Sequence, residues 1–438
     1  MTLMRRACSV VLACAFAVAG LAGCSSGPGW VCACPAAPKP AYAIDVTMAG
    51  RVRWRVPLSP PGSGVQALAV GDVAVFAQSD VLLRRRAAEF PGSRLYGLRL
   101  ADGHRLWSWT FGQGIAGIWR WQNLVVVLTQ IGRSGRPLPV LTGLDASTGR
   151  ARWTLPMGGD VGSSSPTADG GLPVEVNRGD GVLEVVDLSS GRVRWTRPVD
   201  GADLVTAGGG VVVFNASNSQ LTSYDDRTGQ VRWTLPLTSI ALDPTGMHAS
   251  GLVYLTGEVL QSAGGPTQML LGISAADGRV KWRFTCSPVG SLDPHAPGLV
   301  SVRANSGRTS QDELDPATGR VRWHVISPYS AVATPAGIVT ASRRKRISMR
   351  DPLTGQTRWT ARLKGGWLPL IADPGTVSQP PPVLRAGRLL VVPAAGPDGL
   401  DLLAAFRMSD GHRAWQVTTG PIAAPLWAVP GGILVYTV

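Results

Sequence analysis

The sequence predicts an all-β fold, a single β-propeller, and three observations lead to it. A pattern of glycine, three residues and tryptophan recurs at spacings of 36 to 56 residues, which suits units of four short strands. The 438 residues include 54 glycines and 34 prolines, which fits many strands joined by turns better than helices. A hydrophobic fraction of 45% excludes a disordered chain.

The repeated pattern places one tryptophan in the outer strand of each unit. Nine of the 15 tryptophans end a copy: Trp54, Trp107, Trp153, Trp195, Trp233, Trp282, Trp323, Trp359 and Trp415. Alternation along a strand puts the second and fourth residues after the glycine, typically valine and tryptophan, on one face, and the first and third, typically arginine, on the other. We expect the apolar face to pack on the next blade and the arginines to protect the outer edge. An indole array that stacks on bases or sugars is the alternative.

A turn precedes each of these outer strands. The residue before the glycine is Thr, Ser or Asp in eight of nine copies. An aspartate stands four residues before the glycine in five copies: Asp145, Asp187, Asp225, Asp315 and Asp351. Its carboxylate can accept backbone N–H groups while the glycine adopts positive φ, so we expect a tight turn in each unit.

The two ends of the chain each supply half a blade. Residues 42–47 and 51–57 form two strands before the first full unit, and residues 425–429 and 432–437 form two after the last. Their pairing would close the ring. Eight full units and this composite blade make nine blades. A ring of eight blades is commoner, and we favour it. One unit would then be irregular, and the segments 54–107 and 359–415 are the candidates.

The N-terminus indicates export and lipid attachment. A basic start with Arg5 and Arg6 precedes an uncharged apolar run, which ends in Leu-Ala-Gly-Cys at Cys24. We expect a lipoprotein signal peptide at 1–23, an acylated (palmitate-bearing) Cys24 with a flexible tether at 24–41, and the propeller at 42–438. A plain signal peptide or N-terminal anchor is the alternative. The uncharged stretch from Ala414 to the end is interrupted by prolines and glycines, which favours strands over a membrane-spanning helix.

Few residues of the exported chain suggest catalysis or metal binding. Cys32, Cys34 and Cys286 remain after export and lipidation. The pair Cys32-x-Cys34 could hold a metal or form a strained disulfide, but no further motif typical of a metal site supports this, and we interpret the pair as incidental. The sequence has no HExxH, GxSxG or P-loop motif, and His104 and His412 share one position of the repeat, where we expect exposed surface. A formal dinucleotide fingerprint, beginning Gly112-x-Gly114, leads into an expected strand rather than a helix, so we interpret it as a turn.

The net charge of +14 invites an anionic partner. Export removes two arginines, and the nine repeat windows together carry +8 of the remaining +12, about one charge per blade around the rim. Two basic clusters stand apart from the repeat, and they are the candidate interaction residues: Arg84, Arg85, Arg86, Arg343, Arg344, Lys345 and Arg346. They could contact anionic lipid, cell-wall polyanions or an acidic protein surface; a solvated, arginine-rich surface is the alternative. Export disfavours nucleic acid.

The repeats resemble the PQQ-like, or quinoprotein-type, β-propeller family, through the pattern Asp-x-x-Thr-Gly-x-x-x-Trp. Together with the N-terminal signal, the chain resembles BamB-type lipoproteins over residues 42 to 438. In the quinoprotein enzymes, the resemblance would imply a quinone, a calcium ion, a catalytic aspartate and a vicinal disulfide. This chain has no adjacent cysteine pair. The resemblance therefore implies the scaffold without the PQQ site.

We expect a monomeric, membrane-tethered, non-enzymatic scaffold that binds envelope proteins through its loop faces or strand edges, outside the cytoplasm. No catalytic, cofactor-binding or metal-binding residue is predicted. The anchoring membrane is the cell membrane, or the outer membrane if the source has one. The alternatives are an extracellular enzyme that uses PQQ or acts on carbohydrate, and a ligand sensor.

Overall fold

The fold is built from antiparallel strands, and one short 3-10 helix, η1 (Thr238–Ile240), interrupts them within the described residues. The residues from Pro40 to Val438 group into one compact unit. The computed structural model describes these residues: 41–58, 64–79, 93–130, 138–177, 181–199, 203–240, 242–259, 268–286, 292–296, 299–302, 310–326, 331–334, 337–342, 346–363, 383–395, 401–422 and 426–437.

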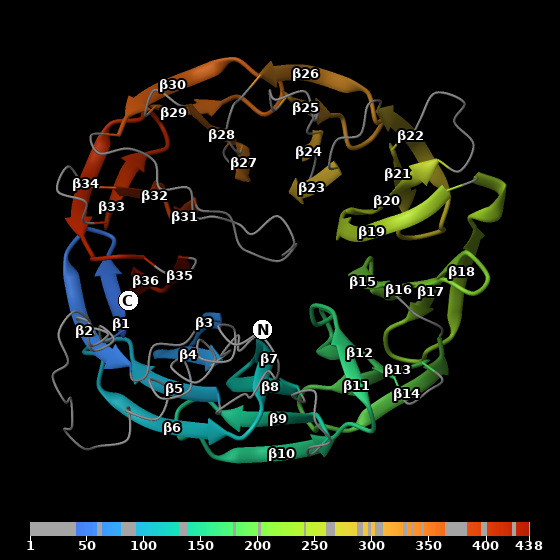
Figure 1. The fold of residues 1–438 in the computed structure, drawn as a ribbon, viewed down its shortest axis with the longest axis horizontal. Coiled ribbons are helices and arrows are strands. Elements are labelled where there is room, and N and C mark those ends of the chain that lie inside the picture. Colours follow the sequence, from blue (N-terminus) through green and yellow to red (C-terminus); the bar gives the residue numbers. More distant parts are fainter. Residues whose placement is uncertain are drawn as a thin grey trace, which may run out of the picture. The chain divides into compact units, whose positions relative to one another are not determined.

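Eight sheets have four strands each, and seven of these use strands in sequence order. The first sheet consists of β3 (Gly64–Val70), β4 (Val73–Ser79), β5 (Ser93–Arg99) and β6 (Arg105–Phe111). The second consists of β7 (Gly114–Trp121), β8 (Leu124–Gln130), β9 (Val140–Asp145) and β10 (Ala151–Pro156). The third consists of β11 (Asp160–Ser163), β12 (Gly171–Asn177), β13 (Gly181–Asp187) and β14 (Val193–Pro198). The next two are β15 (Asp203–Ala207), β16 (Gly210–Asn215), β17 (Gln220–Asp225) and β18 (Val231–Pro236); and β19 (Leu242–Ser250), β20 (Leu252–Val259), β21 (Gln268–Ser274) and β22 (Val280–Cys286). The last two are β27 (Ala331–Thr334), β28 (Gly337–Ser342), β29 (Arg346–Arg350) and β30 (Thr357–Arg362); and β31 (Leu384–Ala386), β32 (Leu389–Ala395), β33 (Asp401–Arg407) and β34 (Arg413–Thr418). In Figure 1 the fourth strand of these sheets lies on the outside and the first lies nearest the centre.

The remaining four-stranded sheet joins the two ends of the chain. Its strand order is β2 (Val52–Leu58), β1 (Ala41–Thr47), β36 (Gly432–Thr437) and β35 (Trp427–Val429). Strand β1 pairs with β36 over six residue pairs, with Ile44 opposite Val435. The predicted closure of the ring by a composite blade is therefore confirmed.

One unit departs from four paired strands, and it is not one of the two that the sequence indicated. Between Trp282 and Trp323, strands β23 (Leu292–Ala296) and β24 (Leu299–Val302) form one two-stranded sheet, and β25 (Ser310–Leu314) and β26 (Val321–Ile326) form another beside it. The units within 54–107 and 359–415 have four strands each, so the expectation of irregularity there was wrong. The number of blades stays a prediction.

The nine repeat tryptophans link each sheet to the next. Every indole N–H donates to a backbone carbonyl in the turn of the following sheet, at 2.7 to 3.1 Å. The last bond, from Trp415 to Met48 O, returns to the composite sheet. The pairs are Trp54 and Leu100, Trp107 and Ala146, Trp153 and Leu188, Trp195 and Asp226, Trp233 and Ala275, Trp282 and Pro316, Trp323 and Pro352, Trp359 and Met408, and Trp415 and Met48. The indoles thus serve the fold, which explains why the chain repeats them.

The glycine of each copy has a second role that the sequence did not reveal. A Cβ atom on Gly229 would lie 2.7 Å from the indole of Trp195 in the preceding sheet, and the other eight motif glycines meet the preceding tryptophan in the same way. Gly229 also has a φ of 66°, which L side chains rarely adopt. Glycine and tryptophan recur together because each glycine receives the indole of the unit before it.

Hydrophobic clusters fill the boundaries between neighbouring sheets. One cluster holds Trp107 and Val127 of the β3–β6 and β7–β10 sheets, and another holds Trp359 and Phe406 of the β27–β30 and β31–β34 sheets. Burial of these side chains is the main favourable contribution to the fold.

Strands account for the uncharged C-terminal stretch, since β34, β35 and β36 lie within it. In the described part of the chain, no helix is long and apolar enough to cross a membrane.

Candidate functional site

The repeat turns form the rim of the molecule, and their aspartates act as predicted. In the turn of the β7–β10 sheet, Asp145 Oδ1 accepts the backbone N–H groups of Ser147 and Thr148, both at 3.1 Å, together with their hydroxyl groups. Asp187, Asp225, Asp315 and Asp351 accept the two equivalent N–H groups of their own turns. All nine motif glycines have positive φ.

The arginine before the tryptophan neutralises the turn aspartate in several sheets. Arg152, Arg194, Arg322 and Arg358 each reach the second carboxylate oxygen of their turn aspartate, at 2.6 to 2.9 Å. Hydrogen bonds from Arg358 and from backbone N–H groups lower the pKa of Asp351 to about 2. Burial alone would raise the pKa of Asp187, but hydrogen bonds from Ser189 and Arg194 hold it at about 2. These carboxylates therefore carry charge at every physiological pH and are already engaged.

The valine of the outer strand points outward, which corrects the predicted alternation. Val231 is 56% exposed, while Trp233, two residues later, is buried. The register between β17 and β18 shifts at this point: Ser223 pairs with Trp233 and Tyr224 pairs with Val231, so the residue between Val231 and Trp233 has no partner on β17. A β-bulge of this kind adds one residue to the outer strand, here Arg232, which donates to Gly208 O at 2.8 Å. Val52, Val193 and Val321 are exposed at the same position.

Most of the predicted interaction residues lie outside the described residues. This applies to Cys24, to Arg84, Arg85 and Arg86, and to Arg343, Arg344 and Lys345, whose roles stay predictions. Arg346 is described: it begins β29, is exposed, and pairs with Arg362 of β30.

The weaker sequence motifs have structural explanations. Gly114 begins β7, so the formal dinucleotide fingerprint leads into a strand, as expected. His104 and His412 are both exposed, and His412 Nδ1 lies 3.4 Å from the carboxylate of Asp410. Among the described residues, no group of three or more His, Cys, Asp or Glu side chains could hold a metal ion.

Two buried acids escaped the sequence analysis. Asp45 of β1 and Glu313 of β25 face a repeat tryptophan across the sheet, at a position that is glycine in Gly97, Gly143 and Gly272. Burial raises the pKa of Asp45 to about 6, opposed by Arg53 at 3.3 Å, and raises that of Glu313 to about 9. The only sequence signal that could have identified these two acids is a charged residue at a strand position that is apolar or glycine in other units.

Arg53 also secures the closure of the ring. Its guanidinium donates to Leu100 O in the next sheet and to Gly431 O in the turn before β36, both at 3.1 Å, while its Nε approaches Asp45 of β1. One side chain therefore connects both ends of the chain and the neighbouring sheet.

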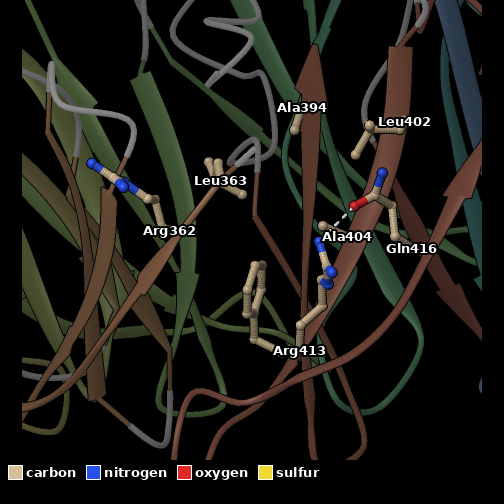
Figure 2. A pocket seen from close by; sticks show the side chains of 8 residues that line it. Arg362, Leu363, Ala394, Leu402, Ala404, Arg413 and Gln416 are labelled. Carbon is tan, nitrogen blue, oxygen red and sulfur yellow. Dashed lines mark hydrogen bonds between the residues drawn. The ribbon is translucent and has the colours of Figure 1, made fainter. Parts of the chain in front are cut away.

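A crevice opens between the β27–β30 and β31–β34 sheets (Figure 2). Leu363, Ala404 and Phe406 form its apolar part, and Arg413 donates to Gln416 at 2.9 Å along one side. Its volume of about 10 Å³ is barely enough for one water molecule. This crevice is therefore a packing seam with a polar margin rather than a pocket for a small substrate.

Comparison with known proteins gives one family and a set of structures with the same fold. The family described as outer membrane protein assembly factor BamB matches the chain over residues 92–241, 241–366 and 312–435. The chain is similar to BamB from Moraxella catarrhalis at 14% identity and a TM-score of 0.41, covering 74% of this chain and 96% of that one. It is also similar to quinohemoprotein alcohol dehydrogenase from Comamonas testosteroni at 12% identity and a TM-score of 0.42, covering 86% of this chain and 74% of that one. No curated protein sequence matches the chain.

Proposed function

This chain belongs to the family described as outer membrane protein assembly factor BamB, and from that premise we propose that it is a non-enzymatic, protein-binding propeller of the cell envelope. The family match extends over most of the propeller and is the observation that carries the proposal. Its partner is an envelope protein, and the propeller acts as a monomer.

The chemistry of the repeat supports a scaffold role. The recurring side chains of the repeat are committed to the fold: the indoles of all nine copies link sheets, and the aspartates of five copies hold the turns, most of them paired with an arginine. What distinguishes one unit from another is therefore the set of exposed residues on outer strands and turns. A scaffold needs such a surface, presented on rigid elements.

We further propose that Cys24 is acylated and anchors the propeller outside the cytoplasm. The export signal ends at this cysteine, and 16 residues rich in proline and small side chains separate it from β1. A tether of this length lets the propeller reach partners embedded in the same membrane.

Crosslinking in intact cells tests the proposed function. A photo-crosslinking amino acid is placed at Val231 or Val321, both exposed on outer strands, and in a matched control at Leu271, which is fully buried. We expect an envelope protein in discrete adducts from at least one exposed position and none from the buried one, identified by mass spectrometry.

Two results would overturn the proposal. One is the absence of any discrete adduct from several exposed positions while the folded chain is present at normal levels. The other is dye-linked dehydrogenase activity of the purified chain that depends on added PQQ and calcium, which would indicate an enzyme.

A further inference from the structure

The sheet of β27 to β30 has one apolar and one polar face. Ile347 and Met349 of β29 join Trp359 of β30 in the cluster shared with the β31–β34 sheet. The alternate residues Arg346, Ser348 and Arg350 therefore lie on the opposite face, toward β25 and β26. Figure 2 shows the same divergence on β30, where Arg362 extends away from its neighbour Leu363.

Two cations stand directly opposite each other on the polar face. Arg346 pairs with Arg362 across β29 and β30, and both are exposed. Among all the cross-strand pairs of the described residues, this one alone joins two cations. Like charges about 5 Å apart at their Cβ atoms destabilise a sheet, unless an anion lies between them.

The next pair along the strands is polar and uncharged. Ser348 lies opposite Thr360, and their hydroxyl groups are 3.0 Å apart. Thr360 is exposed and Ser348 is partly exposed, and hydroxyl groups can both accept and donate a hydrogen bond.

Arg350, at the end of β29 beside the repeat turn, departs from the pattern of the repeat. It stands five residues before the motif glycine, a position held in seven other copies by a buried apolar or aromatic residue: Leu98, Leu144, Val186, Tyr224, Ile273, Leu314 and Phe406. Arg350 Nη1 donates to Gly355 O at 2.9 Å, while its buried Nε has no acceptor among the described residues. Burial lowers the pKa of Arg350, and an unsatisfied guanidinium favours an incoming anion.

Among the described residues, the nearby acidic side chains do not neutralise the charge of these arginines. Asp351 is engaged by Arg358 and by its own turn. Glu313, on β25 of the adjoining sheet, has a pKa of about 9 because it is buried, so its carboxyl group is neutral at pH 7. We call Arg346, Arg362, Ser348, Thr360 and Arg350 the basic strip.

We propose that the basic strip binds an extended, acidic segment of a partner protein, with carboxylates at positions i and i+4 and a polar residue between them. From Arg346 to Arg350 the strand advances about 13 Å, which equals four residues of an extended partner. Alternate side chains of such a segment point to one side and meet the strip in register. Guanidinium groups suit carboxylates because they present paired N–H donors. This inference rests on the proposed protein-binding function and names the chemistry of the partner.

Synthetic peptides and the exported chain test the proposal. Three fluorescein-labelled heptapeptides share a glycine background: one has Glu at positions 2 and 6 with Thr at 4, one has the same composition with adjacent Glu residues, and one has Gln in place of Glu. By fluorescence anisotropy, we expect the first to bind at least about five times more tightly than the other two.

Variants of the chain separate the strip from general charge. Arg346→Ser/Arg362→Ser and, independently, Arg350→Leu should weaken binding of the first peptide about tenfold or more. The matched control, Arg51→Ser/Arg192→Ser, removes two exposed arginines on other sheets and should change affinity less than about twofold at physiological salt. Circular dichroism confirms that each variant is folded.

Several results would overturn the proposal. Equal binding of the peptide with Glu at positions 2 and 6 and the peptide with adjacent Glu would contradict the extended register. Equal losses of affinity in the control variant would show that net charge alone accounts for binding. Loss of binding to phosphatidylglycerol vesicles in Arg346→Ser/Arg362→Ser, with peptide affinity unchanged, would assign the strip to lipid. Adducts in cells that persist in this variant would leave the scaffold function intact while removing the strip from it.

Discussion

The two faces of the β27–β30 sheet differ more in polarity than the alternation of side chains along a strand requires. One face buries Ile347, Met349 and Trp359 against the next sheet, as other sheets of the ring do. The other face carries the basic strip, with Arg350 at a position that is apolar in seven further copies.

The difference shows how a repeat protein acquires a specific surface. Residues that repeat in every unit hold the ring together, so a substitution at one of them costs stability. A residue that departs from its equivalents, such as Arg350, gives up packing at its own position and is free to serve binding. Variants of the two faces should therefore separate stability from binding.

The largest effect is expected on the apolar face. Trp359→Ala removes a buried indole and its hydrogen bond to Met408 O, and should lower the free energy of unfolding by about 3 to 5 kcal/mol. Chemical denaturation measures this loss. Val321→Ala, at an exposed valine, is the control and should stay within about 0.5 kcal/mol of the wild type. A loss below about 1 kcal/mol for Trp359→Ala would contradict the role given to the indoles.

Glu313→Gln should produce a gain that depends on pH. The pKa of Glu313 is about 9 in the folded chain against a reference of 4.5, so the folded state of the wild type retains a proton that the unfolded state releases. The contribution of Glu313 to wild-type stability is therefore highest below pH 4.5 and falls as pH rises toward 9. The variant should match the wild type near pH 4 and exceed it by about 2 to 3 kcal/mol at pH 7.

Denaturation curves at several pH values test this difference. A constant offset between Glu313→Gln and the wild type from pH 4 to 9 would show that Glu313 is not protonated in the fold. Such a result would remove one reason why the basic strip is uncompensated.

Arg350→Leu should stabilise the chain while weakening the binding of an acidic segment. Leucine restores the apolar residue found in the other copies and removes a buried Nε that lacks an acceptor, for a gain of about 1 kcal/mol. Thermal unfolding and peptide titration are measured on the same sample. A loss of stability would indicate that Arg350 serves the fold.

The smallest effect on stability is expected at the end of the strip formed by Arg346 and Arg362. Arg346→Ser/Arg362→Ser removes one repulsive pair of exposed cations and should change the free energy of unfolding by less than about 0.5 kcal/mol. Urea denaturation checks this, and a loss above about 1 kcal/mol would mean that the two side chains pack in the fold.

The architecture could be predicted from the sequence because its signals are periodic. The pattern from Asp145 to Trp153 contains the turn, the positive-φ glycine and the tryptophan at fixed offsets, and the ends of the chain supply complementary half blades. The orientation of Val231 could not be predicted, because the β-bulge that turns it outward leaves no mark in the alternation. The contact between Gly229 and Trp195 joins different units, so no single repeat contains it.

The candidate site was harder to predict for the same reason. The cluster at residues 343–346 suggested an interaction surface, but the partner of Arg346 across the sheet is Arg362, which looks unremarkable in sequence. Arg350 is conspicuous only once all copies are aligned on the motif glycine. Departures from the repeat, rather than runs of charge, are the signal that could have found it.

Photo-crosslinking beside the basic strip shows most directly whether the strip holds a partner protein. A photo-crosslinking residue is placed at Gln356, exposed just before β30 and outside the strip, in intact cells carrying either the wild-type strip or Arg346→Ser/Arg362→Ser. We expect a protein adduct in the wild type whose crosslinked peptide has acidic residues four positions apart, and its loss in the variant. The same adduct at equal yield in both strains would contradict it.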